Sequence, residues 1–291
     1  MLGMNFTRLD VPWPQVDWVR IWDVGCDWSR IHVGPDEYDW TLLDQVVARA
    51  EMINAKVIYT AHGTPTWLAA NPDNPNNAPW MPPGANSVPT SIDEWNKFIW
   101  NLTTRYSGRI HAIELGNELQ LADFLYPYDD ETLSTWATMT WRAHHTIKSI
   151  DPTIVVIGAS ILPRTSSGGI HRAEKWLLHL ADRAWPVDAM ATHIYPLVGE
   201  NYPEFADYYD AARDAVMQQG GPHHMWITES TFDLGGPVMD DAKAQNILRK
   251  VLEKHKGFVF WYAYDRPDLG GMSALFEPGT LAWSELELYR N

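Results

Sequence analysis

Two glutamates stand at the ends of apolar segments that otherwise have the composition of buried β-strands. Glu118 ends the run Ile113-Glu-Leu-Gly-Asn-Glu118, and Glu229 ends the run Met225-Trp-Ile-Thr-Glu229. A carboxylate at such a position is costly unless water or hydrogen bonds compensate it. If the fold brings the two together, one carboxyl group can deliver a proton while the other attacks carbon or activates water. That is the chemistry of glycosidic bond cleavage.

Three further polar residues near these segments suit the same chemistry. Asn117 precedes Glu118, and its amide can bond a substrate hydroxyl next to the reacting carbon. Arg20 lies in the apolar run 18–22, where a guanidinium near Glu229 would hold that carboxylate ionised and in place. Glu114 shares a strand face with Glu118 but lies deeper, so we expect it to be buried and paired, with Arg20 as one possible partner.

Another pair of candidates lies on a single apolar run. His193 and Tyr195 are two residues apart, so both side chains point to the same face of a strand. We expect Tyr195 to bond Glu229, and His193 to position the proton donor or a substrate hydroxyl. The remaining candidates for substrate binding are His62, Trp80 and Trp261.

The elements that would position these residues are short apolar runs rich in Val, Ile and aromatic side chains, which predict strands. Eight such runs are present: Leu2–Phe6, Trp18–Asp23, Lys56–Ala61, Arg109–Glu118, Thr153–Ile161, Ala189–Tyr195, His224–Glu229 and Phe258–Tyr264. Between them, amphipathic patterns predict helices over Trp40–Asn54, Ser91–Tyr106, Glu131–Ile150, Arg172–Ala184, Pro203–Gln219 and Asp241–Lys256, with a short last segment at Ala282–Tyr289.

Strand–helix alternation over the whole length predicts a parallel sheet. Eight repeats in 291 residues fit an α/β (β/α)₈ TIM barrel better than an open doubly wound sheet, and no glycine-rich phosphate loop follows any strand. We therefore expect one domain, a catalytic (β/α)₈ barrel over residues 1–291. Pro12 and Pro14 interrupt the stretch after the first strand, so the first helix should be degenerate. A Ser91–Glu94 capping box is expected to begin the helix at 91–106.

In a barrel, residues at the carboxyl ends of strands gather at one mouth, where active sites lie. The fourth and seventh strands face each other across the lumen, which brings Glu118 and Glu229 together. Two long loops, Asn71–Thr90 and Asp265–Gly279, should lie at the same mouth. The first of these could form one wall of a groove or close a pocket, and we favour an endo-acting site.

Composition excludes several classes of partner. The formal net charge of −15 argues against nucleic acid and anionic membranes, because both repel such a surface. No apolar stretch is long enough for a membrane span, and Cys26 alone cannot form an internal disulfide. The first residues do not resemble a signal peptide, which leaves open a cytoplasmic enzyme, a trimmed secreted enzyme or a phage-encoded cell-wall hydrolase. A monomer acting on a carbohydrate is expected.

Tryptophan is unusually abundant, with 16 residues. Indole rings often stack on flat ligands. Those in or just after strand ends or on long loops are candidates for stacking on sugars: besides Trp80 and Trp261, these are Trp22, Trp67 and Trp226. The tryptophans on helices are expected to pack the outer layer of the barrel.

The whole set resembles glycoside hydrolase clan A, the retaining glycosidases built on (β/α)₈ barrels. The matching features are Asn-Glu on strand four, Glu on strand seven, Arg on strand two, His-x-Tyr on strand six and Trp on strand eight. The opening, from Arg20-Ile-Trp-Asp23 through Tyr38-Asp-Trp40, is most similar to the family 39 branch. By this resemblance Glu118 is the acid/base and Glu229 the nucleophile, and Arg20, Asn117, His193, Tyr195 and Trp261 are site residues.

The resemblance implies hydrolysis of an oligo- or polysaccharide by double displacement, without cofactor or metal. Two alternatives stay open: a carbohydrate-binding or cell-wall-recognition barrel with vestigial activity, and a transglycosylase on the same site. The sequence gives little support to a metal-dependent mechanism. His144 and His145 point apart on a helix, His223 and His224 stand at the wrong end of a strand, and no His-x-His occurs on an early strand.

Overall fold

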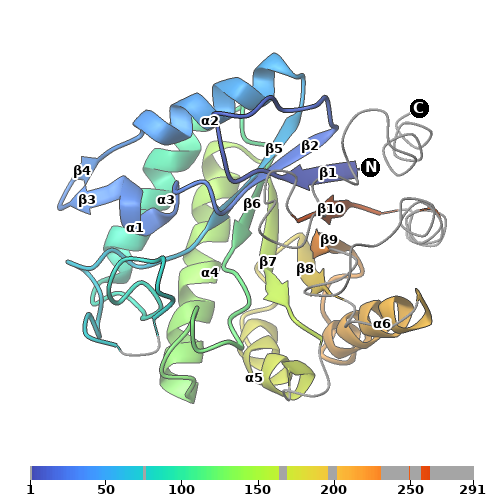
Figure 1. The fold of residues 1–291 in the computed structure, drawn as a ribbon. Helices are drawn as coiled ribbons and strands as arrows, with labels where there is room; N and C mark the ends of the chain where they lie inside the picture. Colours follow the sequence, from blue (N-terminus) through green and yellow to red (C-terminus); the bar gives the residue numbers. More distant parts are fainter. Residues whose placement is uncertain are drawn as a thin grey trace.

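The computed structural model describes residues 2–74, 77–163, 169–195, 202–230, 249 and 257–262. Within this part of the chain, parallel strands close into a barrel with the order β1-β2-β5-β6-β7-β8-β9-β10 (Figure 1). The barrel strands are β1 Leu2–Asn5, β2 Trp18–Ile21, β5 Lys56–Ala61, β6 Ala112–Leu115, β7 Val155–Ile161, β8 Ala189–Ile194, β9 Met225–Ser230 and β10 Val259–Trp261.

Helices follow most strands and lie around the outside of the barrel (Figure 1). They are α2 Thr41–Met52, α3 Ile92–Tyr106, α4 Asp130–Ile150, α5 Gly169–Ala181 and α6 Tyr202–Gln218. A one-turn helix α1 (Trp28–Ile31) and a small antiparallel hairpin, β3 (His32–Gly34) with β4 (Glu37–Tyr38), lie between β2 and α2. The sequence patterns did not predict these last three elements.

The predicted (β/α)₈ barrel is confirmed, and so is the degenerate first helix, because residues 6–17 between β1 and β2 contain no helix. The predicted capping box is wrong. Ser91 is the N-cap of α3 but makes no side-chain cap bond, and Glu94 instead accepts a hydrogen bond from Lys97 at 2.8 Å. Predictions for Asp241–Lys256 (apart from Arg249), Asp265–Gly279 and Ala282–Tyr289 lie outside the described residues.

No helix in the described ranges is both long enough and apolar enough to cross a membrane.

The lower half of the barrel lumen is filled by aromatic rings packed against small side chains. Trp18, Trp226 and Phe260 form this floor together with Ala112, Ala189 and Ala191, and Ile58 and Ile157 complete the cluster. The Trp18 and Trp226 rings meet edge to face at 5.4 Å. Since large residues on some strands face alanines on others, the layer is solid without strain. Trp226 therefore belongs to the core, and its predicted contact with a sugar is wrong.

Because side chains alternate along a strand, the aromatic floor lies directly beneath a layer of polar side chains. Trp18 and Arg20 are two residues apart in β2, so both side chains face the lumen, and Arg20 lies one layer nearer the mouth. The same alternation places Ala112 in the floor and Glu114 above it in β6. The apolar floor seals one end of the lumen, and the polar groups gather where the strands end.

Gly3 in β1 makes room for the aromatic floor, which gives a prediction about stability. A Cβ atom at Gly3 would lie 2.1 Å from the Phe260 ring. We expect Gly3→Ala to lower the free energy of unfolding by about 1–3 kcal/mol, because a rigid ring must move within a packed core. Gly257→Ala is the matched control, since the nearest atom to its Cβ would lie at 3.8 Å. Equal urea midpoints for the two variants would contradict this packing.

Candidate active site

The site is organised around the guanidinium of Arg20, which is fully buried. Its Nε donates to Glu114 at 2.7 Å and its Nη1 to Glu229 at 2.5 Å. Nη1 also donates to Asn5 at 3.2 Å, and Nη2 donates to Asn117 at 2.9 Å. Burial alone would lower the pKa of Arg20, but Glu114 and Glu229 raise it above its ordinary value. The cation is thus permanent and joins four strand ends.

Glu114 is the buried counter-charge at the base of this network. It is fully buried, and its carboxylate accepts hydrogen bonds from Thr60 at 3.0 Å and Thr228 at 2.9 Å in addition to the bond from Arg20. Because both oxygens are engaged by protein donors, Glu114 has a structural part in the site. The expected pairing with Arg20 is confirmed.

Glu229, near the end of β9, is held from two sides. Arg20 bonds Oε1, and the hydroxyl of Tyr195 donates to Oε2. Burial raises the pKa of Glu229 above its ordinary value, while His193 and Arg20 lower it. The two donors present the geometry that an ionised carboxylate accepts, so they oppose the effect of burial. The expected contact between Tyr195 and Glu229 is present.

Glu118 does not end a strand, as the sequence suggested, because β6 stops at Leu115. A turn carries the chain onward, with φ of +111° at Gly116 and +40° at Glu118. Only glycine fits at Gly116, since a Cβ there would lie 2.8 Å from Trp136. The left-handed backbone at Glu118 is costly for a residue with a side chain. Its N–H donates to the Ser160 hydroxyl at 3.0 Å, and this bond secures the turn.

His193 stands between the two glutamates. Its Nδ1 lies 2.7 Å from Oε1 of Glu118 and 3.4 Å from Oε2 of Glu229. An oxygen from each glutamate and a nitrogen of this ring all lie within 4.8 Å of one another. Burial lowers the pKa of His193 to about 4. The imidazole is therefore neutral near pH 7, and the two carboxyl groups face each other at the barrel mouth.

His62 and Asn117 form the adjoining part of the wall. The N–H of Asn117 donates to Nδ1 of His62 at 3.3 Å, and burial lowers the pKa of His62 to about 3. The proton of this neutral ring is therefore on Nε2. The carbonyl oxygen of the Asn117 side chain faces Arg20, which leaves its NH₂ group as the donor for a ligand.

The cluster of Glu118, His193 and Glu229 is compact enough to share a metal ion. The neighbouring groups favour proton transfer at this cluster over binding of a metal ion. Both oxygens of Glu229 already accept bonds from Arg20 and Tyr195. The cationic guanidinium of Arg20, 2.5 Å from Oε1 of Glu229, would also repel a divalent ion bound there.

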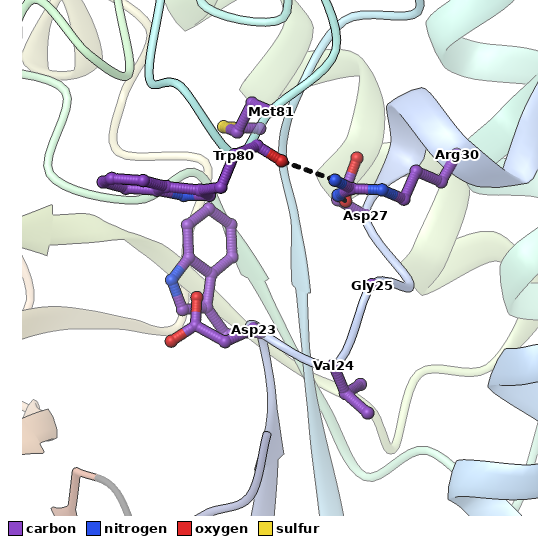
Figure 2. Close-up of a pocket in the computed structure, with 8 residues that line it drawn as sticks. Asp23, Val24, Gly25, Asp27, Arg30, Trp80 and Met81 are labelled. Carbon is purple, nitrogen blue, oxygen red and sulfur yellow. Dashed lines mark hydrogen bonds and ion pairs between the residues drawn. The ribbon is translucent and has the colours of Figure 1, made fainter. Parts of the chain in front are cut away.

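The tryptophans that were predicted to stack on sugars lie in different parts of the structure. Trp261 ends β10, and its side chain lies outside the described residues. Trp80 is 58% exposed and lines a pocket at the mouth together with Trp22 (Figure 2). Trp67 lies away from the glutamates, since its indole N–H donates to the carbonyl of His32 in the β3–β4 hairpin.

Several functional neighbours were not singled out from the sequence. Asn5, Thr60, Thr228 and Ser160 all contact the charged groups or their backbone through hydrogen bonds. Each is a polar residue on or at the end of an apolar strand, which was the available signal. Asp23, which accepts a bond from Tyr262, was not singled out either, although it ends the apolar run 18–23.

No model of a protein family matches the sequence, and no curated protein matches it either. Solved structures do. A GH39 enzyme from Xanthomonas axonopodis pv. citri aligns with a TM-score of 0.68 and 19% identity, over 94% of this chain and 60% of that one. A GH39 β-xylosidase from Caulobacter crescentus aligns with a TM-score of 0.67 and 17% identity, over 94% and 63%.

A GH10 structure from Paenibacillus barcinonensis aligns with a TM-score of 0.66 and 16% identity, over 99% of this chain and 94% of that one. The chain spans only 53% of a glucosidase from Croceicoccus marinus and 60% of the Xanthomonas enzyme. Likeness at this level of identity concerns the fold. The resemblance to clan A read from the motifs is supported at that level, and the chain has the (β/α)₈ barrel fold of GH10 and GH39 glycosidases.

Proposed function

We propose that this protein is a retaining glycosidase that cleaves O-glycosidic bonds by double displacement. The observation that carries the proposal is the approach of Glu118 and Glu229 to within 4.8 Å, oxygen to oxygen, at the barrel mouth. Retaining enzymes hold their carboxyl groups about 5–5.5 Å apart, whereas inverting enzymes leave about 6.5–9.5 Å for a water molecule. A closest approach of this size between oxygens of the two glutamates supports the retaining arrangement.

Glu229 is the nucleophile in this proposal. The bonds from Arg20 and Tyr195 fix both of its oxygens and favour the ionised form that attacks the anomeric carbon. When the glycosyl–enzyme bond forms, the carboxylate loses its charge. Arg20 keeps a counter-ion throughout because Glu114 stays bound to it.

Glu118 is the acid/base, and His193 supports both of its protonation states. With its proton on Nδ1, the neutral imidazole donates to Oε1 of Glu118 at 2.7 Å whether or not Oε2 carries a proton. This contact therefore persists as the carboxyl group gives the Oε2 proton to the leaving oxygen and later takes one from water. The NH₂ group of Asn117 and the Nε2–H of His62 are the donors proposed for sugar hydroxyls.

The choice of first substrates follows from the structural neighbours. These neighbours include a β-xylosidase, an endo-1,4-β-xylanase and a glucosidase. We therefore place 4-nitrophenyl β-xyloside, β-glucoside and their β-1,4-linked biosides first in a panel of aryl glycosides. Transfer to a second sugar would use the same glycosyl–enzyme, and product analysis at high sugar concentration separates it from hydrolysis.

Isosteric variants test the two glutamates. We expect Glu118→Gln and Glu229→Gln each to lower kcat by about 10²–10⁴-fold or more, because each removes a proton transfer or the attacking group. Proton NMR of the first product should show retained configuration. Glu174→Gln, an exposed change on α5, is the matched control. Wild-type turnover in both site variants would refute the assignment of the two glutamates, glycan binding without turnover in the wild type would favour a binding protein, and an inverted product would refute double displacement.

Ser160 should matter for acid catalysis because it holds the turn that carries Glu118. Ser160→Ala removes the hydroxyl that accepts the bond from the Glu118 N–H, and we expect about 1–3 kcal/mol lower stability. The variant should lose more activity on 4-methylphenyl glycosides, whose leaving group needs a proton, than on 2,4-dinitrophenyl glycosides, which need none. Ser160→Thr keeps the hydroxyl and should restore much of the difference. Equal losses on both substrates would argue against a positioning role.

Two of the buried histidines, His62 and His193, predict a loss of stability in acid. His62 and His193 have pKa values of about 3 and 4, below the ordinary 6.5. Between these values and 6.5 the unfolded chain binds more protons, so stability is full above pH 6.5 and falls as pH drops. The slope should reach about 1.4 kcal/mol per pH unit for each histidine.

Urea unfolding at a series of pH values measures this slope. His62→Phe should reduce it by about one proton, and His171→Phe, at an exposed position on α5, is the matched control. An identical slope in the His62 variant would show that this ring titrates normally.

A further inference from the structure

Strand β9 contains one residue more than its neighbour β8 over the stretch that leads to Glu229. Ile227 pairs with Thr192 of β8. The next residue of β8, His193, pairs with Glu229 and not with Thr228. The register between β9 and β10 also shifts after Ile227. Thr228 is therefore an extra residue in the strand, and it forms a β-bulge directly before Glu229.

The bulge brings two consecutive side chains to the same charged network. In a regular strand the side chains of Thr228 and Glu229 would point to opposite faces of the sheet. Here the Thr228 hydroxyl donates to Oε1 of Glu114 at 2.9 Å. The adjacent Glu229 accepts a bond from Arg20 at 2.5 Å, and both residues of the pair are buried. The extra residue thus adds a hydroxyl to the network without moving the nucleophile out of it.

The backbone of the bulge is tied to the same guanidinium. The side-chain NH₂ group of Asn5 donates to the carbonyl of Thr228 at 3.2 Å. The side-chain oxygen of Asn5 accepts a bond from Nη1 of Arg20, also at 3.2 Å, and Nη1 is the atom that bonds Glu229. Thr228 therefore meets the network twice, through its hydroxyl at Glu114 and through its carbonyl at Asn5.

Glu114 and Glu229 share one guanidinium. Arg20 reaches Glu114 through Nε at 2.7 Å and Glu229 through Nη1 at 2.5 Å. The Thr228 hydroxyl satisfies Oε1 of Glu114, whereas Arg20 bonds Oε2. A buried carboxylate oxygen that loses its donor carries an uncompensated cost. Without the hydroxyl, Glu114 would draw the guanidinium toward itself, and the hold on Glu229 would weaken.

Strand β7 has a similar irregularity beside the other glutamate. Its register with β8 shifts between Gly158 and Ser160, so Ala159 is the extra residue. Ser160 then accepts the bond from the backbone N–H of Glu118 at 3.0 Å. The two irregular strands flank β8 in the barrel (Figure 1). Each glutamate therefore has a hydroxyl next to a bulge in its supporting network.

We propose that Thr228 is a positioning residue for the nucleophile: its hydroxyl holds Glu114 so that Arg20 stays shared between Glu114 and Glu229. The inference rests on the glycosidase function proposed above. Thr228 acts through these two residues, and its task is to keep Glu229 ionised and aligned. Ser160 has the corresponding task for Glu118, so the two bulges serve the two carboxyl groups separately.

The ionisation of Glu229 reports on this task. Titratable groups face it from several strand ends: Arg20 on β2, Asp23 after β2, Glu118 after β6, His193 on β8 and Tyr195 after β8. Glu114 lies behind Arg20. Of these groups, the guanidinium is the permanent cation. A weaker hold of Arg20 on Glu229 should therefore raise the pKa of that carboxyl group.

Thr228→Val tests the proposal because it removes the hydroxyl and keeps the shape of the side chain. We expect kcat/KM to fall about tenfold on both 4-methylphenyl and 2,4-dinitrophenyl glycosides of the accepted sugar, since Glu229 must attack with either leaving group. The acid limb of the kcat/KM profile should move up by about one pH unit. Thr228→Ser should restore both. A loss confined to the 4-methylphenyl glycoside would place the effect on Glu118 and overturn the proposal.

Two other threonines control for loss of a buried hydroxyl. Thr140 on α4 is buried and bonds the carbonyl of Trp136 at 3.0 Å, so Thr140→Val should leave the acid limb in place. Thr60 donates to Glu114 from β5, so Thr60→Val should move the limb in the same direction as Thr228→Val. A shift in Thr228→Val alone would locate the effect in the backbone of β9 and overturn the route through Glu114. If Thr228→Val does not fold, Thr60→Val decides, and an unchanged limb overturns the proposal.

A direct titration separates this inference from the proposed function. Carbon NMR of protein labelled at its glutamate carboxyl groups follows Glu229, whose signal is the one missing from Glu229→Gln. Its midpoint should be higher in Thr228→Val than in the wild type. If no glycoside is hydrolysed but the midpoint moves, the glycosidase function fails and the link from Thr228 to Glu229 holds. An unchanged midpoint overturns that link whether or not glycosides are hydrolysed.

Discussion

The site depends on one buried cation that must satisfy two buried carboxylates. Arg20 bonds both Glu114 and Glu229, and the desolvation of three charges is tolerable only because neutral donors complete the network. Thr60 and Thr228 supply those donors to Glu114, and a tyrosine hydroxyl supplies one to Glu229. Removing the guanidinium would leave two uncompensated anions within the barrel. The sequence is therefore constrained at several strands by a single side chain on β2.

This constraint explains why the barrel is layered as it is. A charged network at the mouth needs a dry, rigid support, and the aromatic floor built from Trp18, Trp226 and Phe260 provides it. Because strand side chains alternate, a residue of the apolar floor and a residue of the charged network can be two positions apart on one strand, as for Trp18 and Arg20. The same strands thus stabilise the fold at the floor of the barrel and position the charged residues nearer its mouth.

The sequence was most informative where periodicity and chemistry coincide. Eight apolar runs predicted the barrel, and polar residues on those runs predicted the contacts of Arg20, His193 and Tyr195. It was less informative where geometry departs from a regular element. The Gly116–Glu118 turn has backbone angles that no strand pattern encodes, so the bond to Ser160 could not be foreseen. The β3–β4 hairpin is too short to leave a periodic signal.

The two glutamates are held in opposite ways, and this difference fits their proposed tasks. Glu229 lies on strand β9, and hydrogen bonds fix both of its oxygens. A nucleophile that must approach one carbon atom needs such a fixed position. Glu118 sits on a strained turn outside its strand, fixed through its backbone, and one oxygen of its carboxyl group meets Nδ1 of a neutral histidine while the other is left to exchange the proton. A group that gives up and recovers a proton needs a partner that tolerates both states. The glycine at 116 makes this arrangement possible, because only a residue without a side chain lets the turn approach α4 and β7 closely enough.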